Sequence, residues 1–250
     1  MYFGNDMPIL KAKKIRGLLF DKDGTLIDFE KTWFAIAYEQ ALMAANGNDD
    51  KACYLLELGG YDFTTERFKG DSPMASGSLL DLVKLWHPEL DGIALDNKVL
   101  EYRNHGAERS MLYVCEIDGI SQSLKALKQQ GYILGIATND SELSAKKCVE
   151  KFGWQEYFSE IIGWDSVENA KPAGDQIMLF SKTTRLNLDE IAMIGDNNHD
   201  ISAARNANAG LAIGVLSGTG SKEQLQNNCD LLFPSVVELS HWLINTIDHN

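Results

Sequence analysis

Cysteine is scarce in this chain. The four cysteines form no CxxC pair and are too few for a disulfide framework, which favours a reducing compartment and argues against a zinc site built from thiolates. They stand at Cys53, Cys115, Cys148 and Cys229. We therefore expect a cytoplasmic protein.

Positive charge is also scarce. Lysine and arginine number 23 against 36 aspartates and glutamates, which gives a net charge of -13. Because nucleic-acid-binding proteins present basic patches to the phosphate backbone, this balance argues against a nucleic-acid partner. A small anionic substrate would need a local cation or a metal ion in order to bind.

Long hydrophobic runs are absent as well. The longest uncharged stretch, residues 206–221, is broken by four glycines and is too short to span a bilayer. Only a five-residue apolar patch separates the basic N-terminal residues from Asp21, which is too short for a signal peptide. We expect no membrane segment and no targeting segment, and the sequence has no internal repeats.

Apolar residues make up 44% of the chain, enough for a sizeable core, and 250 residues suit one core with an insertion. Short apolar runs predict strands at 15–20, 133–137, 160–164 and 191–194. Helices are expected between them, with Ser121 and Ser141 as candidate N-caps and a third helix over 202–208. Continuous rather than alternating apolar runs are typical of a parallel sheet with helices on both faces, so we predict an α/β core.

Residues 29–109 show a different pattern. Apolar residues recur there at helical spacing, and no strand is needed to account for them. Further helices are expected over 78–86 and 94–108. We predict a helical domain at 29–109, inserted into a core formed by 1–28 and 110–250.

Two aspartates follow the first predicted strand. Asp21 and Asp23 are two residues apart, so their side chains point to the same side of an extended backbone. Adjacent carboxylates repel each other, and such a pair calls for a cation, a shared proton or a hydrogen-bonding network. Gly24 and Thr25 then mark a sharp turn. Lys22 should point away from Asp21, and we assign it no catalytic role.

Three later segments place further polar residues at strand ends. Thr138-Asn139-Asp140 follows the second strand, Lys171-Pro172 follows the third, and Gly195-Asp196 with Asp200 follows the fourth. This order of DxDGT, strand-Thr, Lys-Pro and GDxxxD, across residues 15–216, resembles the four motifs of the haloacid dehalogenase superfamily. The resemblance implies a Rossmann-like core. The helical insertion resembles the cap of the phosphoglycolate phosphatase-like branch, which closes over the metal site.

The resemblance implies a role for each acidic residue. Asp21 is the nucleophile, which forms an aspartyl-phosphate, and also a metal ligand. Asp23 lends its backbone carbonyl to the metal and acts as the general acid and base. Asp196 is the remaining carboxylate ligand. The implied metal is Mg2+, which prefers oxygen ligands and keeps several waters.

The same resemblance implies the groups that hold the phosphate. The Thr138 hydroxyl bonds a phosphoryl oxygen, Asn139 is a second candidate donor, and Gly24 belongs to the phosphate-binding loop. Lys171 offsets the charge on the nucleophile and the phosphoryl group. Asp200 has two possible roles. The family pattern favours the first, in which it orients metal-bound water or Lys171; in the second, it is a charge that interacts favourably with a helix N-terminus.

Candidates for substrate recognition lie in the insertion. Arg67 and Lys69 are the cations best suited to a substrate carboxylate or distal phosphate, with a solvated surface charge as the alternative. The glycines at 59–60 and the loop at 68–74 are candidate hinges or substrate-facing loops. We expect His199 and the other histidines to have ordinary roles. The insertion's core is expected to include Trp33, Phe34 and Tyr38.

The sequence thus predicts a Mg2+-dependent phosphatase that hydrolyses a small phosphomonoester, phosphoglycolate-like or a sugar phosphate. Two alternatives stay open: a β-phosphoglucomutase-type phosphotransferase, which shares the cap class and all four motifs, and a catalytically idle binding module. The acid/base Asp23 beside the nucleophile Asp21 argues against the idle module, because a pure binder needs neither. The expected partner is a small phosphorylated metabolite, with no nucleic acid and no membrane, and the protein is expected to be a monomer or homodimer.

Overall fold

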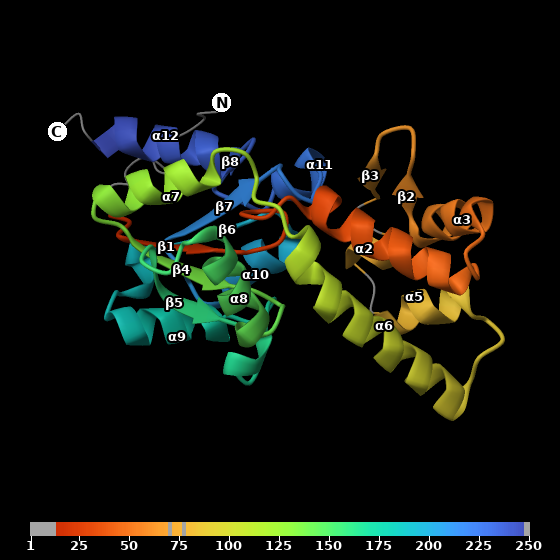
Figure 1. Cartoon of the computed structure of the whole chain (residues 1–250). Coiled ribbons are helices and arrows are strands. Elements are labelled where there is room, and N and C mark those ends of the chain that lie inside the picture. Colours follow the sequence, from red (N-terminus) through yellow and green to blue (C-terminus); the bar gives the residue numbers. More distant parts are fainter. Residues whose placement is uncertain (1–13, 70–71, 77–78, 248–250) are drawn as a thin grey trace. The chain divides into compact units, whose positions relative to one another are not determined.

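The computed structural model of this chain describes residues 14–69, 72–76 and 79–247 (Figure 1). These residues divide into two compact units, a core unit of residues 14–28 and 116–247 and a helical unit, Phe29–Cys115. The N-terminal segment that we expect to lack a targeting signal lies mostly before residue 14 and so outside the described residues. Within the described ranges, no helix has both the length and the apolar character needed to cross a membrane.

The core unit is built on a six-stranded parallel sheet with the strand order β5-β4-β1-β6-β7-β8. Its strands are β1 (Gly17–Phe20), β4 (Ile133–Ala137), β5 (Phe158–Ile162), β6 (Ile191–Gly195), β7 (Leu211–Val215) and β8 (Leu231–Phe233). Every residue of β1, β6 and β7 is buried, as expected for strands that are covered on both faces. The predicted α/β fold is confirmed.

Helices cover both faces of this sheet (Figure 1). The first pair, α7 (Ile120–Gln129) and α12 (Val236–Ile247), pack against each other on one face. On the other face, α9 (Asp175–Thr184) and α10 (Asn198–Asn206) join Leu19 and Met193 of the sheet in one hydrophobic cluster. The remaining elements are α8 (Glu142–Phe152), α11 (Lys222–Leu225) and the 3-10 helices η1 (Trp164–Ser166) and η2 (Leu188–Glu190).

The two predicted serine N-caps have different outcomes. Ser141 caps α8, since its Oγ accepts a hydrogen bond from the backbone N of Ser144 at 3.2 Å. The prediction for Ser121 is wrong. Gly119 takes the N-cap position of α7, and Ser121 Oγ instead donates to Glu116 Oε2 at 2.7 Å.

Two predicted elements are shifted along the chain. β5 begins at Phe158 and ends at Ile162, two residues earlier than predicted, because the chain enters η1 at Trp164. α10 begins at Asn198 rather than at residue 202, because the side chain of Asn197 caps it there. Both shifts depend on where a helix starts, η1 in the first case and α10 itself in the second, and apolar periodicity does not reveal this.

The helical unit contains five helices and a short hairpin among its described residues. They are α2 (Phe29–Ala44), α3 (Asp49–Gly59), β2 (Tyr61–Asp62), β3 (Arg67–Phe68), α4 (Pro73–Ser76), α5 (Leu79–Trp86) and α6 (Gly92–Tyr113). The expectation of a strand-free insertion was wrong, because β2 and β3 pair antiparallel and bury Tyr61 and Phe68. Trp33, Phe34 and Tyr38 pack against the unit's hydrophobic cluster, as expected. Residues 70–71 of the candidate loop 68–74 lie outside the described residues.

The predicted end of the insertion, at residue 109, falls inside α6. This helix continues to Tyr113 because its last turns contact Glu39 of α2. The Nε of Arg109 lies 2.9 Å from Glu39 Oε2, and the Tyr113 hydroxyl donates to Glu39 Oε1. The helical unit therefore ends at Cys115, six residues later than predicted.

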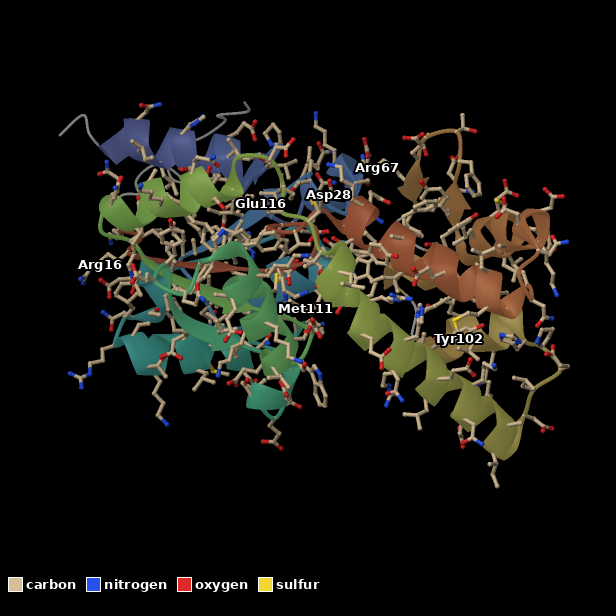
Figure 2. The ribbon with its side chains drawn as sticks, in the orientation of Figure 1. Arg16, Asp28, Arg67, Tyr102, Met111 and Glu116 are labelled. Carbon is tan, nitrogen blue, oxygen red and sulfur yellow. The ribbon has the colours of Figure 1, made fainter. Side chains whose placement is uncertain are left out.

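The two ends of the insertion are adjacent in both units. In the core unit, the backbone N of Ile117 donates to the carbonyl of Leu26 at 3.1 Å. In the helical unit, the backbone N of Cys115 donates to Thr32 Oγ1 at 3.2 Å. Figure 2 labels Glu116, the first residue of the core unit after the insertion.

Candidate active site

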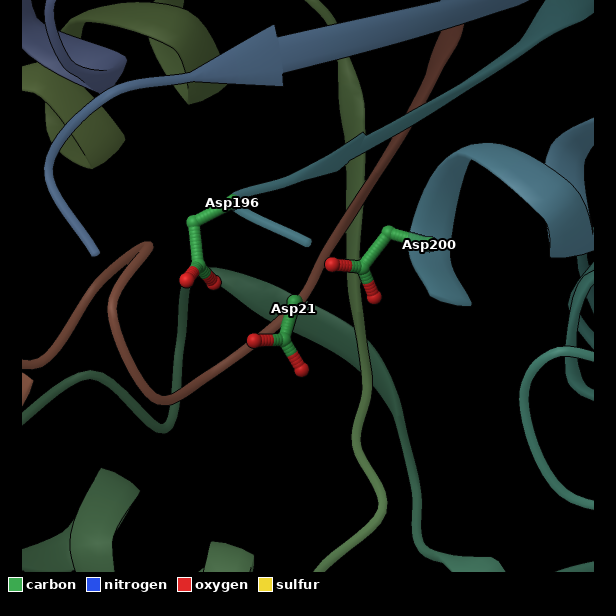
Figure 3. A group of neighbouring side chains, drawn as sticks. All are labelled: Asp21, Asp196 and Asp200. Carbon is green, nitrogen blue, oxygen red and sulfur yellow. The ribbon is translucent and has the colours of Figure 1, made fainter. Parts of the chain in front are cut away.

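Three acidic side chains meet at the carboxyl ends of two neighbouring strands (Figure 3). Asp21 follows β1, Asp196 follows β6, and Asp200 lies in the first turn of α10. One carboxylate oxygen from each lies within 4.8 Å of the other two, and all three residues are buried. The backbone N of Asp21 donates to the carbonyl of Ile194 at 2.8 Å, which fixes the end of β1 against β6.

Lys171 links two of these carboxylates. Its Nζ lies 2.6 Å from Asp21 Oδ1 and 2.6 Å from Asp200 Oδ1, and only 3% of its side chain is exposed. Asp200 Oδ2 accepts a hydrogen bond from the backbone N of Asn197 at 3.0 Å, so both of its oxygens are engaged. This arrangement fits the predicted role of Asp200 in orienting Lys171.

One buried lysine does not balance three buried carboxylates. Burial, together with the charges of Asp21 and Asp200, raises the pKa of Asp196 well above its ordinary value. Burial also raises the pKa of Asp21, although Lys171 opposes the shift. For Lys171, burial alone would lower the pKa, but Asp200 and Asp21 outweigh it and raise the pKa. The surplus negative charge and the all-oxygen donor set fit a divalent cation such as Mg2+.

The carboxylate of Asp196 is held by a loop that follows β7. The backbone N of Thr219 donates to its Oδ2 at 2.8 Å, and Thr25 Oγ1 donates to its Oδ1 at 3.3 Å. A Cβ at Gly218 would lie 2.0 Å from Asp196 Oδ2, and one at Gly24, where φ is +83°, would lie 2.6 Å from the same atom. Only glycine allows the two loops to approach this carboxylate so closely.

The residues after β4 turn back toward the lysine. Thr138 Oγ1 accepts a hydrogen bond from the backbone N of Asp140 at 3.0 Å, and its hydroxyl proton can still be donated to another oxygen. Asn139 Nδ2 donates to the backbone carbonyl of Lys171 at 3.0 Å. The Thr138 loop is therefore tied to the loop that carries the lysine, through a residue that was predicted only as a phosphate donor.

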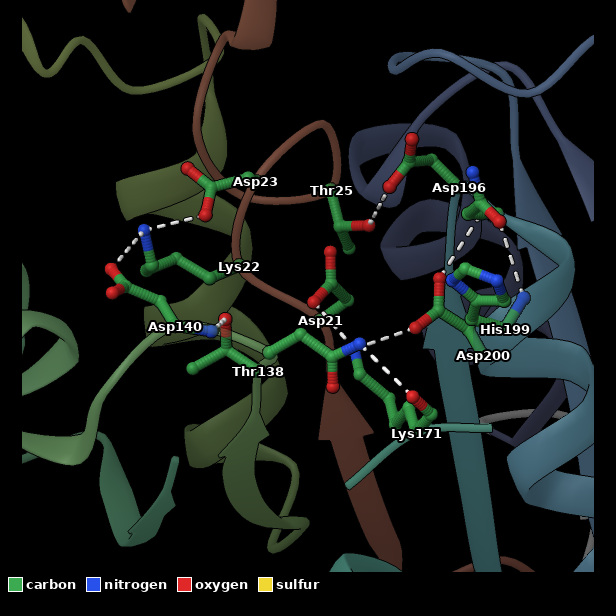
Figure 4. A network of polar contacts seen from close by, with 12 residues as sticks. Asp21, Lys22, Asp23, Thr25, Thr138, Asp140, Lys171, Asp196, His199 and Asp200 are labelled. Atoms are coloured by element: carbon green, nitrogen blue, oxygen red, sulfur yellow. Dashed lines mark hydrogen bonds and ion pairs between the residues drawn. The ribbon is translucent and has the colours of Figure 1, made fainter. Parts of the chain in front are cut away.

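Asp23 lies in a second group of charges (Figure 4). Its Oδ2 lies 2.6 Å from Lys22 Nζ, and Lys22 Nζ also lies 3.2 Å from Asp140 Oδ2. Burial raises the pKa of Asp23, while the charge of Lys22 acts in the opposite direction. The side chain of Asp23 is thus paired with Lys22 and does not belong to the group of Asp21, Asp196 and Asp200.

Three predicted candidates remain, one in the core unit and two in the helical unit. His199 is exposed, and Asn197 Oδ1 accepts a hydrogen bond from its backbone N at 3.2 Å. Arg67 belongs to β3 of the helical unit, with its Nε 3.8 Å from Glu30 Oε1, and the exposed Lys69 follows the same strand.

Residues 18–213 match the sequence profile of a family described as haloacid dehalogenase-like hydrolase. The chain belongs to this family. Among relatives of this hydrolase, the pyrophosphatase PpaX of Halalkalibacterium halodurans is 27% identical over 229 residues, covering 90% of this chain and 95% of that protein. A phosphoglycolate phosphatase of Chromobacterium violaceum is 28% identical over 237 residues, covering 92% and 97%. The crystal structure of a predicted phosphoglycolate phosphatase from Haemophilus somnus shares the fold, with a TM-score of 0.71, 20% identity, and coverage of 92% and 98%.

Two parts of this hydrolase's site were not predicted from the sequence. One is the loop 217–220, for which the glycines at 218 and 220 were a signal, although we considered them only as interruptions of an apolar stretch. The other is the pairing of Lys22 with Asp23 and Asp140. A lysine between two aspartates, directly after a buried strand, was the available signal, since lysine is seldom buried unless it is paired.

Proposed function

We propose that this hydrolase is a Mg2+-dependent phosphatase that acts on a small phosphomonoester through an aspartyl-phosphate on Asp21. The observation that carries this proposal is the buried group of Asp21, Asp196 and Asp200 with Lys171 paired to two of them. Such a site concentrates negative charge for a metal ion while keeping one carboxylate beside a fixed cation. A site of this kind suits phosphoryl transfer, in which positioning and electrostatic stabilisation supply most of the catalysis.

The proposed reaction has two steps. In the first, a carboxylate oxygen of Asp21 attacks phosphorus, the bond between phosphorus and the ester oxygen breaks, and Asp23 gives a proton to the departing alkoxide. In the second, Asp23 takes a proton from the water that attacks the aspartyl-phosphate, which releases phosphate and restores Asp21. Lys171 offsets the charge on Asp21 and on the phosphoryl oxygens throughout.

The metal would be held by the carboxylates of Asp21 and Asp196 and the backbone carbonyl of Asp23. When bound, Mg2+ would neutralise negative charge on the phosphoryl group. Asp200 would act through Lys171, because both of its oxygens are already engaged by Lys171 and Asn197.

The phosphate itself would be bound by groups on two loops, the one after β4 and the one after β1. The Thr138 hydroxyl would donate to a phosphoryl oxygen, with Asn139 and the backbone around Gly24 as further donors. This assignment is supported by the backbone ties that fix the loops, notably Asn139 Nδ2 to the Lys171 carbonyl and Ser217 Oγ to the Gly24 carbonyl at 2.7 Å.

The helical unit would act as the cap that selects the substrate, with Arg67 or Lys69 contacting a second anionic group. A substrate anion would compete with Glu30 for Arg67. Changing either cation to glutamine should then raise KM for a doubly anionic substrate far more than for a phosphate ester without a second charge. Lys84→Gln, on the exposed side of α5, is the matched control. Equal losses on both substrates would place Arg67 and Lys69 outside recognition.

Phosphate release over a panel of substrates tests the activity. The panel should include phosphoglycolate and inorganic pyrophosphate, which the names of the two relatives specify, and sugar phosphates, which the sequence predicts as an alternative. We expect turnover with Mg2+, none in excess EDTA, and none with Asp21→Asn, whereas Asp189→Asn on the exposed surface keeps full activity. Activity that survives chelation would refute the requirement for a metal ion, and activity that survives Asp21→Asn would refute the assignment of Asp21 as the nucleophile.

A further inference from the structure

Lys22 is a buried cation with no role in the reaction as described so far. Only 6% of its side chain is exposed, although it occupies the position between the two aspartates of the DxDGT motif. Removing an ammonium group from water costs several kcal/mol, so a buried lysine requires close and well-placed partners. In this chain, both of its partners come from the candidate site.

These partners belong to two different loops. Asp23 Oδ2, on the loop after β1, lies 2.6 Å from Lys22 Nζ, and Asp140 Oδ2, on the loop after β4, lies 3.2 Å from it. Figure 4 shows the ammonium between the two carboxylates and apart from Lys171. The site therefore has two separate lysines, one paired with the nucleophile and the other with the proposed acid/base.

Asp140 is itself firmly held. Its Oδ1 accepts a hydrogen bond from the backbone N of Ser141 at 2.7 Å, and its own backbone N donates to Thr138 Oγ1 at 3.0 Å. Ser141 is the N-cap of α8, so Asp140 is anchored at the start of a helix. Lys22 thus connects the Asp23 side chain to a fixed point of the core unit.

The geometry at Asp23 leaves one oxygen available. Lys22 contacts Oδ2, and within the described part of the chain Oδ1 accepts no hydrogen bond. A carboxylate held by one oxygen cannot rotate freely about its χ angles, and its second oxygen keeps a defined direction. Proton transfer in a transition state depends on such placement.

We propose that Lys22 is a positioning residue, which holds the Asp23 carboxylate through Oδ2 and directs Oδ1 toward the leaving group, with Asp140 as its anchor. This inference rests on the proposed function, because it requires Asp23 to be the general acid and base. Lys22 itself touches neither the substrate nor the metal, and acts only through Asp23.

The test compares substrates whose leaving groups differ in their need for a proton. Lys22→Met should lower kcat on an alkyl phosphomonoester by roughly 10- to 100-fold, a part of the loss of about 100- to 10,000-fold for the general acid itself. The pre-steady-state burst of p-nitrophenolate from p-nitrophenyl phosphate should change less than threefold, because that leaving group departs without a proton. Lys182→Met, an exposed lysine of α9, is the matched control and should change neither rate.

A double-mutant cycle separates positioning from a purely structural role. In an Asp23→Asn background, Lys22→Met should change kcat less than twofold, because the group on which it acts is gone. Asp140→Asn should reproduce a smaller version of the Lys22→Met effect on the alkyl substrate. If Lys22→Met fails to fold, the pair Lys22→Met/Asp140→Asn removes one charge of each sign and takes its place.

Two outcomes would overturn the inference. In the first, Lys22→Met lowers the rates on both substrates equally. In the second, Lys22→Met still lowers kcat in the Asp23→Asn background. Either result would mean that Lys22 merely neutralises buried carboxylates. A wild-type protein that releases phosphate from no phosphomonoester would instead defeat the proposed function, so the two failures are distinguishable.

Discussion

Replacing Lys171 by methionine should destabilise the metal-free protein by about 3–5 kcal/mol at neutral pH, the usual cost of breaking a buried ion pair from one side. The Lys171 ammonium lies 2.6 Å from both Asp21 and Asp200, whose side chains are only 12% and 3% exposed. Its removal leaves two carboxylates buried without a countercharge. A surface ion pair, in contrast, contributes only about 0–1 kcal/mol.

The deficit should depend on pH in a defined direction. Burial raises the pKa of Asp21 even with Lys171 opposing it, so the pKa must rise further without the lysine. A carboxyl group with a raised pKa in the folded state costs no stability below its ordinary pKa and costs more as the pH rises through the folded value. We therefore expect a larger deficit at pH 7.5 than at pH 5.

Urea unfolding in EDTA, followed by circular dichroism, measures this quantity. Lys182→Met, an exposed lysine of α9, should stay within about 0.5 kcal/mol of wild type. A loss below about 1 kcal/mol for Lys171→Met, or a deficit that is no smaller at pH 5, would show that Lys171 does not balance these carboxylates.

Three further predictions follow from the site and its surroundings. The pKa of the buried Asp196 carboxyl group is raised well above its ordinary value, so the Asp196→Asn variant should have a higher thermal midpoint in EDTA than wild type, and Mg2+ should no longer raise the midpoint of the variant. A midpoint in EDTA below that of wild type would contradict this prediction. Gly218→Ala places a Cβ 2.0 Å from Asp196 Oδ2 and should weaken Mg2+ binding at least tenfold in a titration, whereas Gly106→Ala in α6 should not. Burial raises the pKa of Cys148 to about 12, so this thiol should resist Ellman's reagent at pH 8 until the protein unfolds; labelling as fast as that of Cys53 would disprove its burial.

The parts of the site that follow directly from strand ends were predictable. Each of three site residues directly follows the last residue of a strand: Asp21 after β1, Thr138 after β4 and Asp196 after β6. The carboxyl ends of parallel strands meet at one edge of the sheet. Their positions along the chain therefore fixed their positions in space.

Features that depend on distant contacts were not predictable in this way. The loop at 217–220 closes on Asp196 through hydrogen bonds of Thr219, and nothing near Asp196 in the sequence indicates them. The end of α6 depends on Glu39, which lies far earlier in the chain. The two-residue strands β2 and β3 are shorter than any alternation that could reveal them.

Because the two ends of the insertion are adjacent, the inserted segment can be deleted or replaced in evolution and in protein engineering. Because Leu26 and Ile117 are hydrogen-bonded within the core unit, residues 29–115 leave and return at nearly one point, and closing the gap with a short turn would cost little loop entropy. The same arrangement lets a longer or different segment be accommodated there without disturbing the sheet. The inserted segment of such a core can therefore be replaced, in evolution or by design, while the residues at the strand ends keep their positions.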